Sequence, residues 1–502
     1  MSKLSEAEQV ARLQAPASID WLKDIEEINA YLKASEADTL ALIAYLQNPK
    51  VVPRPPNNGD IEFGFVLYWI HYPPPEVKKY LADSLALRLI YDVIKLLVPQ
   101  TKITPEQYAC LEDDFDGYGE PGADGTMYGK KKYQQLDKGW MLSFLNYMIN
   151  VYEGSVTALP NLPTKPVALS AKDRNVSGGV VLGIVGDWGT GYYPDEGGIH
   201  CPAQRVMEQL TDRNRSPVPD YLIHLGDVYY AGTDLRPPPG EEQANFYDKW
   251  PDQGTGRNFT LNSNHEMYGA DSGYFDVALA QPKFSGQQGM SYFAMTYGKW
   301  LVLGLDSAYY SDAYNGRHMY MYGAIGADGF TRQCDWLKQF RSWQGPIMVM
   351  THHGAADTIT AEVYPLYTQV VAALQRAPTL WYWGHVHNGI VYNKLYTSKT
   401  APKMFSFTKG RCCGHGAIPF GKAWGLEDAS GKQDPNVAYF AHTPDIKLPN
   451  TIGPLPPNPR VRNGYALVTL QADGSCSEAF YETDIVGPVW QNSWTAAELA
   501  AE

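Results

Sequence analysis

Aspartate and histidine side chains stand directly after short apolar runs at four places in this sequence. Aspartates follow glycine at Asp187 and Asp227, and histidines occur at His352 and at the closely spaced positions His385 and His387. Each preceding apolar run predicts a buried strand. Because an open α/β sheet brings its strand ends to one edge, side chains at such ends converge on rigid supports. We therefore expect these residues to share one site.

A fifth segment adds an amide and a further carboxylate. Asn264, His265 and Glu266 follow one another in a region with little predicted regular structure. Carboxylate, amide and imidazole groups suit first-row transition metals, and none of these blocks offers a thiolate. Together the donors suffice for two ions, so the sequence predicts a metal centre.

In chain order the blocks are GDWG, GDVYY, NHE, THHG and GHVH, and they lie between about residues 178 and 390. This ordered set resembles the five signature motifs of the calcineurin-like metallophosphoesterases. The resemblance implies an α/β fold, a four-layer αββα sandwich, and hydrolysis of phosphoesters at a dinuclear metal centre. The alternative makes every block a turn or a core histidine, and five blocks in the family's order argue against it.

The resemblance also implies a role for each donor. The implied metal ligands are Asp187, Asp227, Asn264, His352, His385 and His387. Asp227 would bridge the two ions, Asp187 and His387 would complete the first site, and the other three residues would complete the second. Ser263 stands where the family usually has glycine, which concerns backbone geometry rather than the donor set.

One ligand of the wider family is missing, because Gly189 stands where most members have a histidine two residues after the first aspartate. The purple acid phosphatases share that absence and carry a tyrosine three residues after the bridging aspartate, a position held here by Tyr230. A phenolate is a hard anionic donor that favours a trivalent ion. The resemblance therefore implies Fe(III) beside Fe(II), Zn(II) or Mn(II), and a packing or hydrogen-bonding role is the alternative for Tyr230.

Residues beside the implied ligands are candidates for chemistry on the phosphoryl group. We expect a metal-bound hydroxide to attack phosphorus, with His265 as general acid or transition-state contact and Glu266 orienting it. His353 is a candidate phosphate contact or, equally, a packing residue. Arg411 is a candidate substrate-binding residue in the glycine-rich stretch Gly410–Gly416, for which a solvated turn is the alternative.

The chain of 502 residues exceeds the size of a single core, so we expect a helical N-terminal module at 1–155 and a metallophosphoesterase domain at 176–485. Beyond residue 176, short apolar runs alternate with amphipathic segments, as in layered α/β proteins. Strands are predicted at 180–185, 221–225, 300–305, 347–351 and 380–383, and helices at 202–214, 332–343 and 362–377. The tail beyond residue 400 is strand-like again and is predicted to complete the sheet.

The net charge of -13 repels polyanions, so no nucleic-acid or anionic-membrane partner is expected. No apolar run approaches the roughly 18 residues of a membrane span, and the first residues are polar, which favours a cytoplasmic location. The expected partner is a small phosphoester, and the oligomeric state stays open. A phosphomonoesterase is the leading hypothesis; a phosphodiesterase with the same metals and a catalytically weak docking protein are the alternatives.

Overall fold

The computed structural model describes residues 156–500 apart from internal gaps, the longest at 398–407 and 442–460, together with scattered positions between 72 and 150. Most of the predicted N-terminal helical module therefore lies outside the described residues, although positions 140, 143, 146, 147 and 150 are helical. Within the part of the chain that is described, no helix combines the length and the apolar character that crossing a membrane requires.

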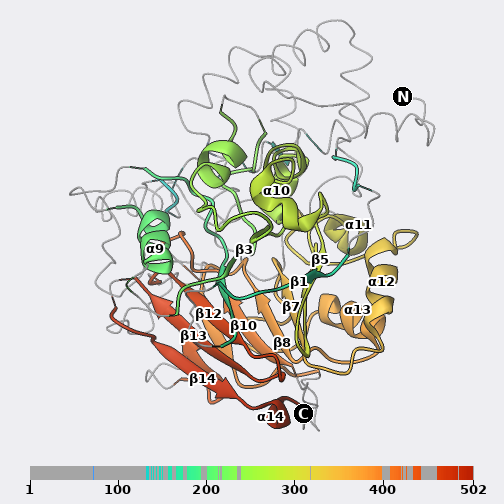
Figure 1. The fold of residues 1–502 in the computed structure, drawn as a ribbon. Helices are drawn as coiled ribbons and strands as arrows, with labels where there is room; N and C mark the ends of the chain where they lie inside the picture. The colour runs from blue at the N-terminus through green and yellow to red at the C-terminus, as the bar shows by residue number, and fades with distance from the viewer. Residues whose placement is uncertain are drawn as a thin grey trace, which may run out of the picture.

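Two sheets form the centre of the molecule (Figure 1). The larger has the strand order β1-β5-β6-β7-β8-β10-β9-β11, and the smaller has the order β14-β13-β12-β2-β3-β4. The larger sheet contains β1 (Val167–Ala168), β5 (Phe293–Tyr297), β6 (Trp300–Gly304), β7 (Ile347–Thr351), β8 (Leu380–Trp383), β9 (Gly389–Tyr392), β10 (Lys409–Cys413) and β11 (Val437–Phe440). The smaller contains β2 (Val180–Val185), β3 (Tyr221–His224), β4 (Asn258–Thr260), β12 (Gly464–Leu470), β13 (Cys476–Glu482) and β14 (Trp490–Trp494).

Short helices cover the sheets and connect their strands. Among the described residues beyond 156, the α-helices are α9 (Pro202–Thr211), α10 (Asn264–Tyr268), α11 (Ser311–Asn315), α12 (Arg332–Leu337), α13 (Pro365–Leu374) and α14 (Ala496–Ala500). Single turns of π- or 3-10 helix occur at η2 (Glu242–Tyr247), η3 (Gly273–Ala278), η4 (Pro282–Gln287) and η5 (Lys338–Phe340). Helices α9 and α13 both begin with proline, whose fixed φ suits the first helical position.

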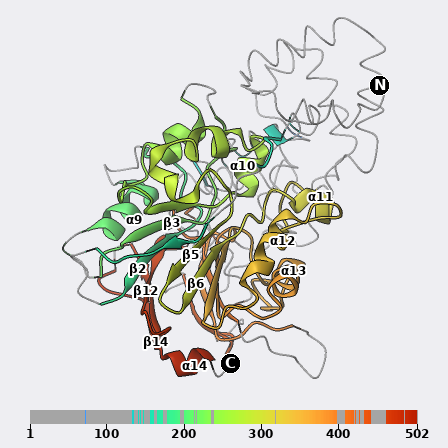
Figure 2. The same cartoon turned by 45° about the vertical axis from the view of Figure 1, so that its right-hand side comes forward.

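The alternation of side chains along buried strands divides the core into three parts. In β2, Leu182 and Ile184 belong to the core between the sheets, whereas Val181 and Val185 belong to the core that includes α9. In β7 the same alternation places Met350 in the inner core and its odd-numbered apolar neighbours in the core beneath α12 and α13. Figure 2 shows the two sheets side by side, with α9 outside one and α12 and α13 outside the other. The predicted α/β class and four-layer sandwich are confirmed.

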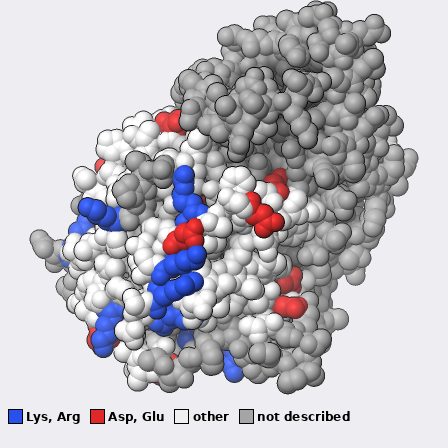
Figure 3. Space-filling model, turned by 90° about the vertical axis from the view of Figure 1, so that its right-hand side faces the viewer, with Lys and Arg blue, Asp and Glu red and all other residues white. Residues whose placement is uncertain are grey.

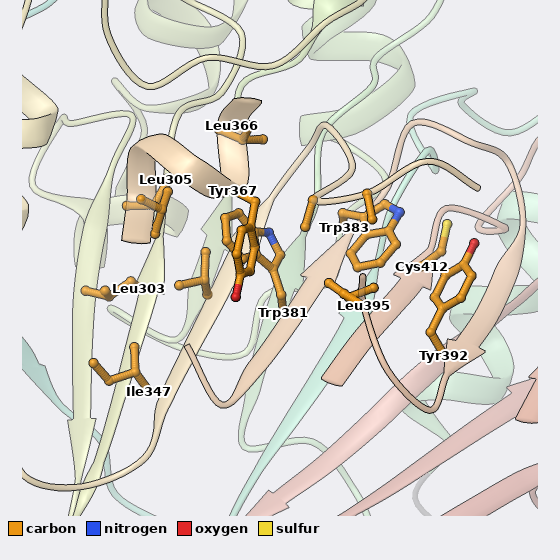
Figure 4. Close-up of a cluster of buried hydrophobic side chains, with 14 of the residues drawn as sticks. Leu303, Leu305, Ile347, Leu366, Tyr367, Trp381, Trp383, Tyr392, Leu395 and Cys412 are labelled. Carbon is orange, nitrogen blue, oxygen red and sulfur yellow. The ribbon is translucent and has the colours of Figure 1, made fainter. Parts of the chain in front are cut away.

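Aromatic stacking holds α13 against the strands that carry the candidate ligands (Figure 4). The ring of Tyr367 on α13 stacks on Trp381 of β8 at a centroid distance of 5.5 Å, and Trp383 stacks on Tyr392 of β9 at 5.8 Å. The indole N–H of Trp381 also donates to Thr351 Oγ1 at 2.8 Å. Because Thr351 and Trp383 are the last residues of β7 and β8, this packing fixes the position of both strand ends.

Lysine and arginine side chains gather in a band on the face that carries α12 and α13 (Figure 3). Near these helices in the chain, two arginines bond to backbone carbonyls: Arg341 donates to Ala373 and Arg376 donates to Trp343. Since Ala373 lies in the last turn of α13, Arg341 satisfies one of the carbonyls that a helix end leaves without an intrahelical partner. These arginines therefore tie the outer helices together on an otherwise acidic protein.

Most predicted elements occur within one to three residues of their expected bounds. The helix expected at 362–377 is shorter, because it starts at Pro365 and ends where Gln375 adopts a left-handed conformation with φ 59°. The tail completes the smaller sheet as predicted, with Ala466 of β12 opposite Ile184 of β2. The stretch Gly410–Gly416 differs from the expected turn, since its first part lies in β10, hydrogen-bonded between β8 and β9.

Candidate metal centre

Two aspartates meet because their strands are parallel neighbours. β2 and β3 pair with Val185 opposite His224, so the loops that follow both strands leave the same edge of the sheet. The loops are also bonded to each other: the amide of Asp187 donates to Gly226 O at 2.9 Å, and the amide of Gly189 donates to Asp227 O at 3.0 Å. The carboxylates of Asp187 and Asp227 are thereby held side by side on rigid backbone.

Gly226 is required by this arrangement. Its φ of 97° lies in the left-handed region that side chains disfavour, and a Cβ there would lie 2.9 Å from His352 Nδ1. Asp227 itself has a φ of 80°, a conformation that aspartate tolerates better than most residues. The Gly-Asp pair thus follows from the tight turn as well as from the chemistry of the carboxylate.

The other sheet delivers histidines to the same place. β7 and β8 are parallel neighbours with Thr351 opposite Trp383, and the amide of Gly384 donates to His352 O at 2.9 Å. The amide of His385 reaches across to the first sheet, where it donates to Asp187 Oδ2 at 2.9 Å. The strand ends of the two sheets therefore converge on one buried cluster.

The carboxylate of Asp227 lies between two groups of donors. Its Oδ1 is 3.2 Å from His352 Nε2, and its Oδ2 is 4.0 Å from His387 Nε2. In the group around His387, Asp187 Oδ1 is 3.5 Å from His387 Nε2, and Asp187, Asp227 and His387 offer atoms that all lie within 4.8 Å of one another. In the group around His352, Asn264 Oδ1 lies 2.8 Å from His352 Nε2. Asp227 is placed as a bridging ligand would be.

The chemistry of the cluster fits metal ions. The Oδ1 of Asp227 is buried and accepts no hydrogen bond, an expensive state for a carboxylate unless a cation neutralises it. Burial lowers the pKa of His352 to about 4 and that of His387 to about 3. Both rings are therefore neutral at neutral pH and keep the lone pair that a metal requires. Burial alone would raise the pKa of Asp227, but the neighbouring histidines, His352 foremost, hold it well below its usual range.

The structure brings six of the seven predicted ligands together and leaves Tyr230 out. The hydroxyl of Tyr230 donates to Asp137, and its ring packs 4.9 Å from Tyr133, so the phenol faces away from the carboxylates. The hydroxyl of its neighbour Tyr229 faces the cluster instead, 2.9 Å from Asp227 Oδ2 and 3.0 Å from His387 Nε2. Counting positions from the aspartate selected Tyr230, whereas the backbone of the turn directs Tyr229 inward.

His265 is fixed close to the carboxylates. Its Nδ1 lies 2.6 Å from the carbonyl oxygen of Tyr230, so Nδ1 carries the proton that this carbonyl accepts, and its ring is 4.5 Å from that of Tyr229. Ser263 caps α10 by accepting the amide of His265 at 3.0 Å, and its hydroxyl donates to Glu266. Glu266 therefore acts on His265 through Ser263, which gives a structural reason for serine at that position. Burial, followed by the charge of Asp227, raises the pKa of Glu266 to about 8.

His353 differs from the expected phosphate contact. It is buried, its Nδ1 is 2.9 Å from Ser307 Oγ, and its Nε2 is 2.6 Å from the carbonyl oxygen of Tyr320. A neutral ring has one donor and one acceptor nitrogen, and both are engaged with the protein. His353 is thus a packed neighbour of His352 and His385.

Arg411 also differs from its expected role, since it is 1% exposed and its guanidinium forms two bonds of 2.9 Å to Glu478 on β13. A further guanidinium N–H donates to the carbonyl of Tyr392. The side chain therefore joins the two sheets and is used in bonds within the protein. The sequence around Arg411 could not predict this partner, because Glu478 lies 67 residues away in the chain.

An aromatic wall from the N-terminal segment closes one side of the cluster and was missed by the sequence analysis. Trp140 packs edge-on against Tyr229 at 5.6 Å and against His265 at 6.1 Å, and the hydroxyl of Ser143 donates to the carbonyl of Tyr230 at 2.7 Å. No spacing rule links positions so far apart in the chain, so sequence alone offered no signal for this contact.

One family of known proteins matches the part of the chain that holds this cluster. Residues 181–389 match the family described as calcineurin-like phosphoesterase. That stretch contains all six clustered donors, and it matches the family that the five motifs resemble. No curated protein matches the sequence.

Several solved structures are similar to part of this chain at low identity. A structure described as "GAP50 the anchor in the inner membrane complex of Plasmodium" is 12% identical, with a TM-score of 0.39, and the match covers 63% of this chain and 89% of that one. The purple acid phosphatase PPD1 from yellow lupin (Lupinus luteus) seeds is 13% identical, with a TM-score of 0.36 and coverage of 62% and 53%. A PhoD structure is 12% identical, with a TM-score of 0.36 and coverage of 68% and 70%.

Proposed function

We propose that this protein hydrolyses phosphoesters at a dinuclear metal centre built from Asp187, Asp227, Asn264, His352, His385 and His387. The observation that carries the proposal is the position of Asp227, whose two carboxylate oxygens face different donor groups. Two cations bound there would neutralise phosphoryl oxygens and lower the pKa of a water nucleophile. An acidic protein of net charge -13 would gain in this way the local positive charge that an anionic substrate needs.

The surrounding residues orient His265 and shield the cluster. His265 keeps its proton on Nδ1 through the Tyr230 carbonyl, so its ring has a single orientation beside the cluster. From there it is placed to contact the phosphoryl group or to act at the leaving oxygen. The Ser263 hydroxyl fixes the backbone of His265, and Glu266 fixes that hydroxyl. The wall that includes Trp140 limits the access of bulk water on this side of the site.

Two measurements test the proposal. Metal analysis should find about two transition-metal ions per chain, and the loaded protein should hydrolyse a nitrophenyl phosphate. Asp227→Asn should lose both the metals and the activity, because an amide is a weaker, uncharged ligand that bridges two cations poorly. A protein that holds two metals and turns over no phosphoester would refute the catalytic role and leave the docking alternative.

The purple acid phosphatase branch and the preference for monoesters are finer parts of the proposal. Comparing a nitrophenyl monoester with a bis-nitrophenyl diester at equal concentrations ranks the two substrate classes; a faster diester reaction would favour the phosphodiesterase alternative. Neither class requires a change in the metal ligands, because the two differ in the contacts around the phosphoryl group.

For iron, we propose that the phenol of Tyr229 takes the ligand position that the motif assigned to Tyr230. Its hydroxyl is 2.9 Å from the bridging carboxylate, whereas that of Tyr230 is bonded to Asp137. An Fe(III) phenolate absorbs visible light, so the purified protein should be coloured. Tyr229→Phe should remove the band and Tyr230→Phe should keep it. The reverse result would restore the motif assignment, and two colourless divalent ions would refute the purple acid phosphatase branch.

A further inference from the structure

The amide of Asn264 presents two chemically different ends to its surroundings. Its Oδ1 faces the cluster, 2.8 Å from His352 Nε2 and 3.1 Å from His385 Nδ1. Its Nδ2 points the other way, donates to the hydroxyl of Tyr268 at 3.0 Å and also lies 3.9 Å from the sulfur of Met321. Only the oxygen can bind a cation, while rotation of the amide by half a turn would place the NH2 group there instead. The orientation of the amide therefore decides whether Asn264 is a ligand at all.

The hydroxyl of Tyr268 has a defined direction. It accepts the N–H of Asn264, and it lies 3.5 Å from the sulfur of Met321, to which it donates its own hydrogen. A hydroxyl has a single hydrogen, so occupying it at Met321 leaves the oxygen lone pairs for the amide. The thioether is an acceptor only, and it cannot reverse this chain of bonds from Asn264 through Tyr268 to Met321.

Tyr268 is itself held in place. It stands four residues after Asn264 on α10, which puts both side chains on one face of the helix. Its ring is packed edge-on against His265 at 5.0 Å and Tyr147 at 6.0 Å, and its side chain is buried. The side-chain amide of Asn150 donates to the backbone carbonyl of Tyr268. The phenol therefore reaches Asn264 from a fixed position.

We propose that Tyr268 is a positioning residue that keeps the amide oxygen of Asn264 toward the metal centre, with Met321 setting the direction of its hydroxyl. The inference rests on the proposed dinuclear site, and it extends that site to two residues outside the five sequence motifs. It assigns Tyr268 no contact with substrate. The expected consequence is tighter binding of the ion that Asn264 serves.

The test is calorimetric titration of Mn(II) into the metal-free protein, which reports binding without relying on turnover. Tyr268→Phe keeps the ring and removes the hydroxyl. It should weaken the binding of one of the two ions about ten-fold or more, as loss of a residue that holds a metal ligand in place does. The other ion should bind as in the wild type. Tyr367→Phe is the matched control, because it removes a buried tyrosine hydroxyl that bonds Thr408 on the far side of the larger sheet. It should leave both affinities unchanged.

A second background separates orientation from packing. Asn264→Asp replaces the amide by a carboxylate whose two ends are equivalent, so orientation ceases to matter. Adding Tyr268→Phe to that background should change the Mn(II) affinity less than about two-fold, and the difference between the backgrounds measures the coupling. An equal loss in both backgrounds would show a packing effect and overturn the inference.

The remaining outcomes are equally distinct. A wild-type protein that fails to bind two ions would refute the proposed function itself. A wild type that binds two ions, with Tyr268→Phe matching it, would overturn only the positioning role. If Tyr268→Phe does not fold, as judged by circular dichroism and thermal melting, the same Mn(II) titration of Met321→Leu tests the inference. A several-fold weakening of the same ion supports the inference, and wild-type affinity overturns it.

Discussion

Neutralising Glu478 tests whether Arg411 holds the two sheets together. Arg411 on β10 and Glu478 on β13 form a two-pronged ion pair with both contacts at 2.9 Å, and their side chains are 1% and 0% exposed. The remaining acceptor capacity of the carboxylate is used by the hydroxyl of Tyr382 at 2.6 Å and the indole of Trp494 at 2.8 Å. Burial alone would raise the pKa of Glu478, but Arg411 and these donors hold it below its ordinary value.

Glu478→Gln keeps the shape of the side chain and leaves the guanidinium of Arg411 as an uncompensated buried charge. Removing one partner of a buried pair costs about 3–5 kcal/mol, much more than the pair contributes net of desolvation. Adding Arg411→Met removes the stranded charge, while the glutamine oxygen still accepts from Tyr382 or Trp494. The double variant should therefore recover most of the lost free energy of unfolding.

The assay is urea unfolding of the metal-free protein followed by tryptophan fluorescence, to which Trp494 contributes. As a control, Asp335→Asn breaks the exposed pair with Lys338 and should be indistinguishable from the wild type. A loss below about 1 kcal/mol for Glu478→Gln, the range of an exposed pair, would refute the reasoning. If the double variant is stable yet its KM for phosphoesters rises sharply, Arg411 contacts substrate as the sequence suggested.

Three further results are expected. Gly226→Ala should lower the free energy of unfolding by about 1–3 kcal/mol and weaken metal binding, since a Cβ at φ 97° would meet the ring of His352; unchanged urea midpoint and metal content would contradict this. Ser263→Ala should cost about 1 kcal/mol through loss of the α10 cap and should lower kcat, and an unaltered kcat would show that Ser263 does not position His265 for the reaction. Burial lowers the pKa of His224 and of His415 to about 3, so the unfolded chain binds more protons than the folded one below about pH 6.5. The free energy of unfolding of the metal-free protein should therefore keep this contribution in full above that pH and lose it as the pH drops toward 3. His415→Gln should reduce the slope of the free energy of unfolding against pH by about 1.4 kcal/mol per pH unit, the value for uptake of one proton. An unaltered slope would contradict this expectation.

The sequence determined the donors and the strands that carry them. Short apolar runs such as 347–351 and 380–383 can be stable only as buried strands, and their ends carried His352 and His385. Parallel pairing of the strands then brings these side chains together, because the carboxyl ends of neighbouring parallel strands lie at the same edge of a sheet. The α/β class followed from these local features, whereas the four-layer sandwich and the roles of the six donors were implied by the resemblance of the five motifs to a known family.

Other properties depended on contacts between distant segments. The motif placed a tyrosine at the site, but whether Tyr229 or Tyr230 enters it depends on the torsion angles of the turn and on the partner that Asp137 offers. The partner of Arg411 lies in a different sheet, so its role could not be inferred from neighbouring residues.

The same limit applies to Tyr268 and Met321, whose sulfur meets the phenol only after the chain between them has folded. The residue types and the spacing of apolar residues can be read from the sequence, and they determine which groups can bind a metal and which segments become strands. The direction of a side chain and the identity of its partner arise from packing across the chain, and only the tertiary structure decides them.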